Sequence, residues 1–333
     1  MQAPSRLRAA NGPDIFADQL PTQALLPNPP SFAGHQTFAL RSAWLKKGLD
    51  ALLVNARVFA ADDALVTLGV GKNMVSAIRH WLIATQLVTS NAERSGELQA
   101  NDLGAFLLTD KGFDPYLEDP ATLWLLHWNL CGPGSQAYTW AYAFNIWREW
   151  EWSEGTLAHA ILGSAQANSS KVSSFETIKR DVGVFIQTYL APTDRGQNTE
   201  DGLDCPLREL GLLRPALGNQ QQYTFVVGPK PSMPTAIFAW ALLKFWDWKY
   251  PGTTTIAARD ITYTEGSPGM VFKLDEDSTL VYLDQLEALT NGHLRFEDTP
   301  LVRQVIRTTA EMLTPEALLY LHYAAPLLER QLA

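Results

Sequence analysis

Two groups of acidic residues have the composition that metal-assisted phosphodiester cleavage needs. Asp114, Glu118 and Asp119 lie close together in the sequence, and Asp201 and Asp204 form a second group. Such cleavage uses two or three carboxylates around a divalent ion, often with a lysine nearby. We therefore select Asp114, Glu118 and Asp204 as candidate catalytic residues, with Mg²⁺ or Mn²⁺ as candidate cofactor. Neither group completes a nuclease signature, and acidic loop residues are commonly only solvated.

His35 is a further catalytic candidate, because the loop from Gly34 to Thr37 precedes a helix whose first turn could bind an anion. No two of the six histidines have the spacing of a helical metal-binding pair. The two cysteines, Cys131 and Cys205, lack a neighbouring base and are too few for a disulfide scaffold. The residues therefore give acyl transfer no local support.

Basic residues concentrate in one segment of an acidic chain. The 333 residues carry a formal net charge of −9, which argues against indiscriminate coating of nucleic acid. Residues 35–90, by contrast, have a local charge of +3. Spacings of three and four residues place several polar side chains after Gly71 on one helix face. The candidate DNA-binding residues are Arg41, Lys46, Lys72, Asn73, Ser76, Arg79, Lys179 and Arg180. The alternative is a protein-docking module with an ordinary solvated face.

Hydrophobic periodicity predicts elements that would position these residues. Apolar residues recur at helical spacing between Gly34 and Leu53 and again from Met74, with a glycine-containing turn between the two runs. The segment from Glu97 to Lys111 alternates weakly, which we interpret as a short hairpin. Two helices, a turn and a hairpin predict a winged helix-turn-helix domain.

The middle of the chain is rich in tryptophan: six of the 11 tryptophans lie between Trp124 and Trp152. We interpret them first as a helical core and second as a ligand platform. Asp119 and Pro120 are typical of the N-cap and first position of a helix, and Ser173 with Glu176 predicts a capping box. A long loop is expected over 192–206.

The predicted fold class is mainly α, with winged helix-turn-helix domains, a Trp-rich helical region and small β-wings. We expect a flexible Pro-rich N-terminal segment (1–31), a winged helix-turn-helix domain (32–115), a Trp-rich helical middle domain (116–250) and a C-terminal helical domain (251–333) that could also be winged-helix-like. No apolar stretch approaches the roughly 20 residues of a membrane span, and the N-terminus lacks a signal-peptide core. The expected location is the cytoplasm.

Several blocks of residues occur in the order found in one bacterial family. They are Phe32 to Phe38 with Arg41 to Gly48, Leu68 to Val75 with Ile78 to Trp81, Asp114 to Asp119 with Thr122 to Trp128, and Asp204 to Leu207 with Glu209 to Leu212. On these blocks the chain resembles a family of formerly unknown function, associated with phosphorothioation and phage defence, that includes the DNA nickase SspB. The resemblance spans about residues 32–250.

This resemblance implies a DNA-binding nickase within a system that replaces one non-bridging phosphate oxygen of DNA by sulfur. It implies DNA, an ATPase and sulfur-transfer proteins of the same system as partners, and it carries over no catalytic residue. A non-catalytic adaptor that recruits the sulfur-transfer machinery to DNA is the alternative. A third hypothesis has the basic helices dock onto a partner ATPase. A homodimer is compatible with all three.

Overall fold

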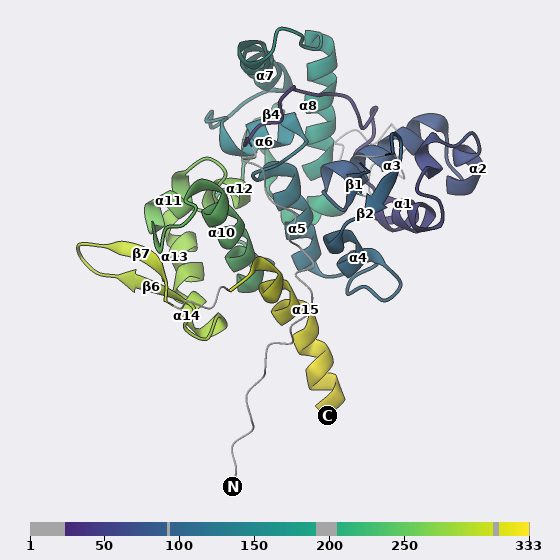
Figure 1. Ribbon diagram of the computed structural model, residues 1–333. Helices are drawn as coiled ribbons and strands as arrows, with labels where there is room; N and C mark the ends of the chain where they lie inside the picture. The colour runs from purple at the N-terminus through teal and green to yellow at the C-terminus, as the bar shows by residue number, and fades with distance from the viewer. Residues whose placement is uncertain (1–23, 92–93, 191–204, 309–312, 333) are drawn as a thin grey trace.

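The computed structural model describes residues 24–91, 94–190, 205–308 and 313–332. Over these residues the chain is mostly helical, with small antiparallel sheets, which confirms the mainly α expectation (Figure 1). None of the helices described is both long and apolar enough to cross a membrane.

The first part of the chain combines short helices with a hairpin. Its elements are α1 (Ser42–Val54), the 3-10 helix η1 (Val58–Ala60), α2 (Ala64–Leu68), α3 (Lys72–Ala84), β1 (Val88–Ser90), β2 (Leu98–Ala100) and α4 (Asp102–Leu108). The hairpin is antiparallel and pairs Val88 with Ala100. The expectation of extended structure from Glu97 to Lys111 is wrong after residue 100. There the Asn101 side chain accepts the Gly104 N–H at 2.8 Å and so caps α4.

The middle part contains the most deeply buried helix. Its elements are α5 (Pro120–Cys131), α6 (Tyr138–Asn145), α7 (Glu154–Asn168), α8 (Phe175–Tyr189), the 3-10 helix η2 (Pro206–Leu210), β3 (Leu213–Ala216) and β4 (Asn219–Phe225). Helix α5 begins as predicted, with Asp119 as N-cap and Pro120 in the first turn. The predicted Ser173–Glu176 capping box does not form, because Ser174 is the N-cap and accepts the Thr177 N–H. Most of the predicted loop over 192–206, including Asp201 and Asp204, lies outside the described residues.

The last part surrounds a small three-stranded sheet. Its elements are α10 (Thr235–Lys249), β5 (Thr255–Ala257), α11 (Ala258–Tyr263), α12 (Pro268–Phe272), α13 (Glu276–Asp284), α14 (Leu286–Leu289), β6 (Leu294–Asp298), β7 (Arg303–Arg307) and α15 (Pro315–Leu332). The strand order is β5-β7-β6, and both pairings are antiparallel. In Figure 1, α5 lies between this part and the helices α1 to α4, and α15 packs against Phe106 of α4 through Tyr320 and Tyr323.

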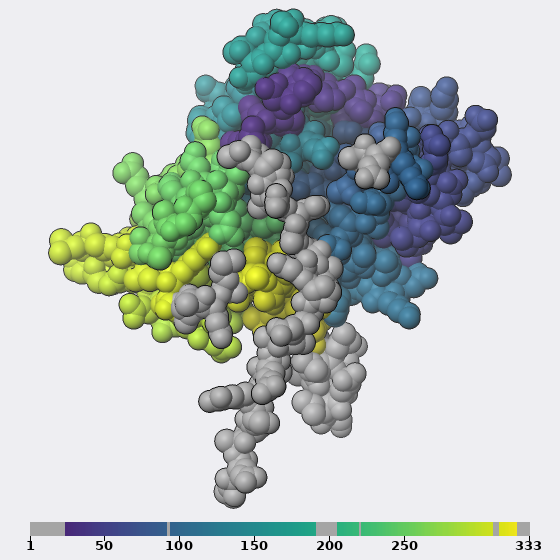
Figure 2. Space-filling model, viewed as in Figure 1, coloured from purple at the N-terminus to yellow at the C-terminus, as the bar shows by residue number. Residues whose placement is uncertain are grey.

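A large hydrophobic core extends from Leu40 to Tyr323. It contains Trp124, Trp140 and Trp152, each at most 1% exposed, which supports the core interpretation of the Trp-rich region. Trp150 is the exception, with 68% of its surface exposed. Figure 2 shows the start of the described chain, in purple, lying across the teal helices of the middle part. This placement brings the loop that contains His35 onto α6 and α8.

Candidate functional site

The exposed face of α3 collects the central group of predicted DNA-binding residues. Lys72, Asn73 and Arg79 are exposed, Ser76 is half-buried, and the opposite face packs into the core through residues such as Trp81. The turn before α3 contains Gly69 in the left-handed conformation (φ 61°). Neither Lys72 nor Arg79 forms an ion pair with another described residue. We call these four residues the α3 basic face. The first amide groups of α3, which have no intrahelical acceptor, lie at the same end and favour an anion.

The remaining predicted DNA-binding residues belong to other segments of the chain than α3. Lys46 is only 9% exposed, and its Nζ lies 2.5 Å from Asp50 Oδ1 and 2.7 Å from Asp110 Oδ1. The Arg41 guanidinium lies over the ring of Trp44 at 5.0 Å. The other two, Lys179 and Arg180, belong to α8.

His35 lies in the core, where it belongs to a buried polar network. Its side chain is 1% exposed, and its Nε2–H donates to Asp181 Oδ1 at 2.8 Å. Asp181 also accepts the Ala33 N–H at 2.6 Å and the Thr139 hydroxyl at 2.6 Å. The network therefore fixes the loop of residues 33–35 to α6 and α8. In this structure the imidazole has no open path to a substrate phosphate.

A second histidine shares this core with His35. The rings of His35 and His80 are 5.4 Å apart, and neither His35 Nδ1 nor His80 Nε2 has a hydrogen-bond partner among the described residues. Burial, followed by the proximity of His35, lowers the pKa of His80 to about 4. His80 is thus neutral at physiological pH and does not act as a general acid there.

Asp114 organises the turn before α5. Its Oδ1 accepts the Glu118 N–H at 2.8 Å, and its Oδ2 accepts the Asp119 N–H at 3.1 Å and the Thr122 hydroxyl at 2.6 Å. Thr122 Oγ1 also lies within hydrogen-bond distance of Tyr323 Oη in α15, at 2.8 Å. Asp119 Oδ2 lies 2.9 Å from Nε2 of His322 in the same helix. The carboxylate is 5% exposed. These contacts tie the start of α5 to α15.

The described carboxylates do not fit a Mg²⁺ site. Mg²⁺ requires free oxygen ligands in near-octahedral geometry, whereas both oxygens of Asp114 already accept hydrogen bonds. Glu118 meets Asp114 only through its backbone amide, and its side chain is exposed. In the part of the chain that the structure describes, no three His, Cys, Asp or Glu residues are grouped to hold a metal ion. Asp204, the third candidate, lies outside the described residues.

Sequence reasoning did not select Asp181, although its contacts organise the His35 loop. A signal for it exists in the helical pattern. Asp181 lies among Ile178, Val182 and Phe185, which form the apolar stripe of α8. A carboxylate on a face that is otherwise buried must find hydrogen-bond donors. The pattern therefore indicates a buried acid, but it does not indicate which distant segment supplies the donors.

The similarities to known proteins cover most of the chain. The family model described as "Protein of unknown function (DUF4007)" matches residues 32–323. The magnesium ion-bound SspB crystal structure is similar with a TM-score of 0.80 and 30% identity. A second SspB crystal structure gives a TM-score of 0.78 and 31% identity. Each likeness covers 88% of both chains. A search among curated proteins gives no match.

Proposed function

The chain belongs to the DUF4007 family, and we propose that it is an SspB-like, DNA-binding nickase component of a bacterial DNA phosphorothioation and anti-phage defence system. The likeness to SspB over 88% of the chain supports the assignment to this system. The magnesium in one of the SspB structures supports a divalent ion as cofactor. The proposed partners are DNA and the ATPase and sulfur-transfer proteins of the same system.

The observation that carries DNA binding is the α3 basic face. Lys72 and Arg79 project into solvent without an ion-pair partner among the described residues, on a chain whose formal net charge is −9. When exposed cations without an ion-pair partner bind DNA phosphates, they release the counterions condensed on the DNA, and this release favours binding. We propose that α1, α2, α3, β1 and β2 act as a winged helix, a proposal that their order along the chain supports, and that α3 enters the major groove.

The adaptor function is the second candidate, and the contacts of Asp114 favour it. This carboxylate is saturated by hydrogen bonds from the turn and from α5, so it is a structural group in the described conformation. A protein that binds DNA through α3 without cutting it would need no carboxylate cluster. Both functions use the same DNA-binding face, and they differ in the fate of the phosphodiester bond.

Gel-shift titration of a short duplex tests the DNA-binding face. We expect Lys72→Ala and Arg79→Ala each to weaken DNA binding at low salt. Each substitution should also lower by about one the number of counterions released on binding, as read from the salt dependence of the affinity. Lys171→Ala is the matched control, because it removes an exposed positive charge from the loop before α8. If the α3 variants bind as tightly as the wild-type protein, α3 is not the DNA-binding helix. If the wild-type protein binds no duplex at any salt concentration, docking to a protein partner is favoured instead.

A plasmid assay separates the nickase from the adaptor. Supercoiled plasmid that becomes open-circular only with Mg²⁺ or Mn²⁺ supports nicking, and Asp114→Asn, Glu118→Gln and Asp204→Asn then test the carboxylates. Urea unfolding of each variant distinguishes loss of a ligand from loss of the fold, because Asp114 holds a turn. Nicking that survives all three substitutions would place the catalytic site at other residues. Plasmid that stays supercoiled while it shifts on a gel would favour the adaptor.

A further inference from the structure

A cavity of about 340 Å³ opens where the end of α6, strand β4 and helices α11 and α12 meet. It contains none of the catalytic or DNA-binding candidates selected from the sequence, but Trp147 and Trp150 of the Trp-rich region line it. Its size falls within the range of small-ligand sites. The lining residues that bear on its chemistry are Trp147, Arg148, Trp150, Phe225, Tyr263 and Lys273.

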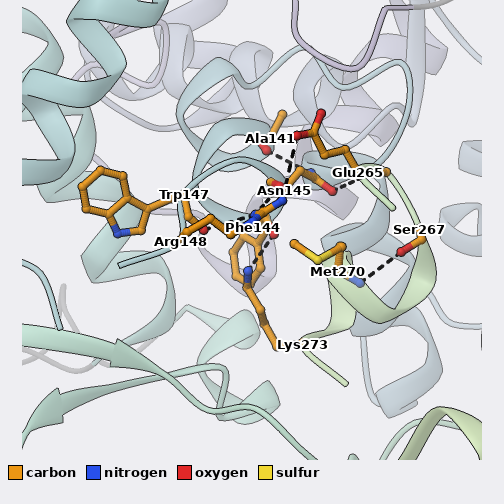
Figure 3. A network of polar contacts seen from close by, with 10 residues as sticks. Ala141, Phe144, Asn145, Trp147, Arg148, Glu265, Ser267, Met270 and Lys273 are labelled. Atoms are coloured by element: carbon orange, nitrogen blue, oxygen red, sulfur yellow. Dashed lines mark hydrogen bonds and ion pairs between the residues drawn. The ribbon is translucent and has the colours of Figure 1, made fainter. Parts of the chain in front are cut away.

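Lys273 is the central charge of this cavity. The side chain is only 7% exposed, and it forms no ion pair with a described carboxylate. Its Nζ donates to the Phe144 carbonyl at 2.6 Å and lies 4.4 Å from the centre of the Phe225 ring. Figure 3 shows Lys273 extending from the end of α12 toward Phe144. A buried ammonium with one carbonyl acceptor is costly and favours an anion beside it.

Further positive charge lies around Lys273. Arg148 follows α6, and its Nη1 donates to the Asn145 carbonyl oxygen at 2.5 Å (Figure 3). Its Nη2 lies 3.9 Å from Glu265 Oε1. Lys230 is 5% exposed and donates to the Val226 carbonyl. Burial, then the nearby Arg148, lowers the pKa of Lys273 to about 7. The acidic Glu149 also lines the cavity, but it is exposed and forms no ion pair with Lys273.

The aromatic part of the lining is unusual for a soluble protein surface. Trp150 is 68% exposed and Tyr263 is 51% exposed. Trp147 buries its indole Nε1, which has no hydrogen-bond partner among the described residues. The cavity therefore combines exposed aromatic faces with the buried Lys273 and the exposed Arg148.

We propose that this cavity binds one nucleotide of unpaired DNA, with the base against Trp147 and Trp150 and the phosphate toward Arg148 and Lys273. Aromatic stacking combined with cationic contacts to the backbone is the common chemistry of single-stranded DNA binding. The proposal rests on the proposed function in DNA, because separation of the strands at a nick supplies unpaired nucleotides. A free mononucleotide presents the same base and phosphate, so the experiment includes both sources.

Fluorescence anisotropy with a labelled oligothymidylate and a labelled duplex of equal length tests the site. We expect Trp150→Ala to weaken binding of the oligothymidylate about tenfold and to leave duplex binding unchanged. Tyr116→Ala is the matched control, because Tyr116 is an equally exposed aromatic residue (69%) outside the cavity. Lys273→Met should also weaken the single strand, and urea unfolding checks that this variant folds.

The outcomes distinguish this site from the α3 basic face. Unchanged oligothymidylate affinity in Trp150→Ala, or duplex binding by the wild-type protein with no single-strand binding, would overturn the cavity proposal and leave the proposed function standing. Failure of the wild-type protein to bind either DNA would count against both. Binding of dTMP without binding of the oligothymidylate would overturn DNA as the source of the nucleotide.

Discussion

Asp181 is the residue on which the polar contacts of the His35 loop depend. It is 3% exposed and accepts hydrogen bonds from Ala33, His35 and Thr139. Donors that are buried without an acceptor cost much more free energy than the same donors in water. The carboxylate therefore stabilises the junction between the first segment, α6 and α8.

We expect Asp181→Ala to lower the free energy of unfolding by about 3 kcal/mol, because it leaves two buried donors and one half-buried donor without their acceptor. Urea unfolding followed by circular dichroism measures this change. Gln187→Ala, an exposed position on the same helix, should stay within about 0.5 kcal/mol of the wild-type protein. Equal stability of the two variants would show that the network contributes nothing.

Residue types in the sequence indicate which chemistry a side chain can perform, but not whether the fold buries that side chain. The donors to Asp114 come from residues four to eight positions later, so a local turn explains that carboxylate. The partner of His35 lies 146 positions away. No spacing rule connects two residues across such a distance, and this is why sequence reasoning selected His35 without its acceptor. Lys273 was missed because its charge becomes informative only once its burial is known.

At the level of elements, local signals predicted the start of α5, whereas the start of α1 depends on distant contacts and was not predicted. Asp119 and Pro120 start α5 through a cap and a fixed φ, and both signals are local. The periodicity that begins at Gly34 predicts a helix too early, because α1 begins only at Ser42. Asp181 holds residues 33–35 in turns, so contacts from another element override the helical pattern there.

Substituting alanine for either of two glycines tests how tightly the elements pack. A Cβ on Gly104 would collide with the Leu87 carbonyl oxygen, because α4 lies directly against the start of the hairpin. Gly163 is exposed in α7, and a Cβ there would meet nothing within 4 Å. We expect Gly104→Ala to destabilise the protein by about 1–3 kcal/mol. Gly163→Ala should stabilise it by about 0.5–1 kcal/mol through the unfolded state.

Thermal unfolding of these two variants, with the wild-type protein alongside, measures both effects. The midpoint should fall for Gly104→Ala and rise for Gly163→Ala. A fall in both variants would mean that the exposed part of α7 does not gain from a better helix former. A rise in both would contradict the close contact between α4 and the hairpin.

At the scale of the whole molecule, the core continues across the predicted domain boundaries. Most buried apolar residues from Leu40 to Tyr323 form one cluster, to which α5 contributes along its entire length after Pro120. Ala64, Leu68 and Val75 of α2 and α3 form a small second cluster. A continuous core favours a single cooperative unfolding transition over separate transitions of the predicted domains. His80 in α3 and His127 in α5 report on two different regions of this core.

The two histidines make this cooperativity measurable. Burial lowers the pKa of His127 to about 3 and that of His80 to about 4, from an ordinary value of 6.5. Below pH 6.5 the unfolded chain therefore binds protons that the folded chain excludes, and stability falls as the pH falls toward 4. Each histidine contributes a slope of about 1.4 kcal/mol per pH unit.

Urea unfolding at several pH values between 6 and 4.5 should show one transition, in which both histidines take up a proton. The free energy of unfolding should then change by about 2.7 kcal/mol per pH unit. His80→Leu removes one of the two groups and should halve the slope while leaving a single transition. If the region around α3 unfolded independently of α5, two transitions would appear, each carrying one proton. Stability that does not change over this pH range would contradict the buried, neutral state of both histidines.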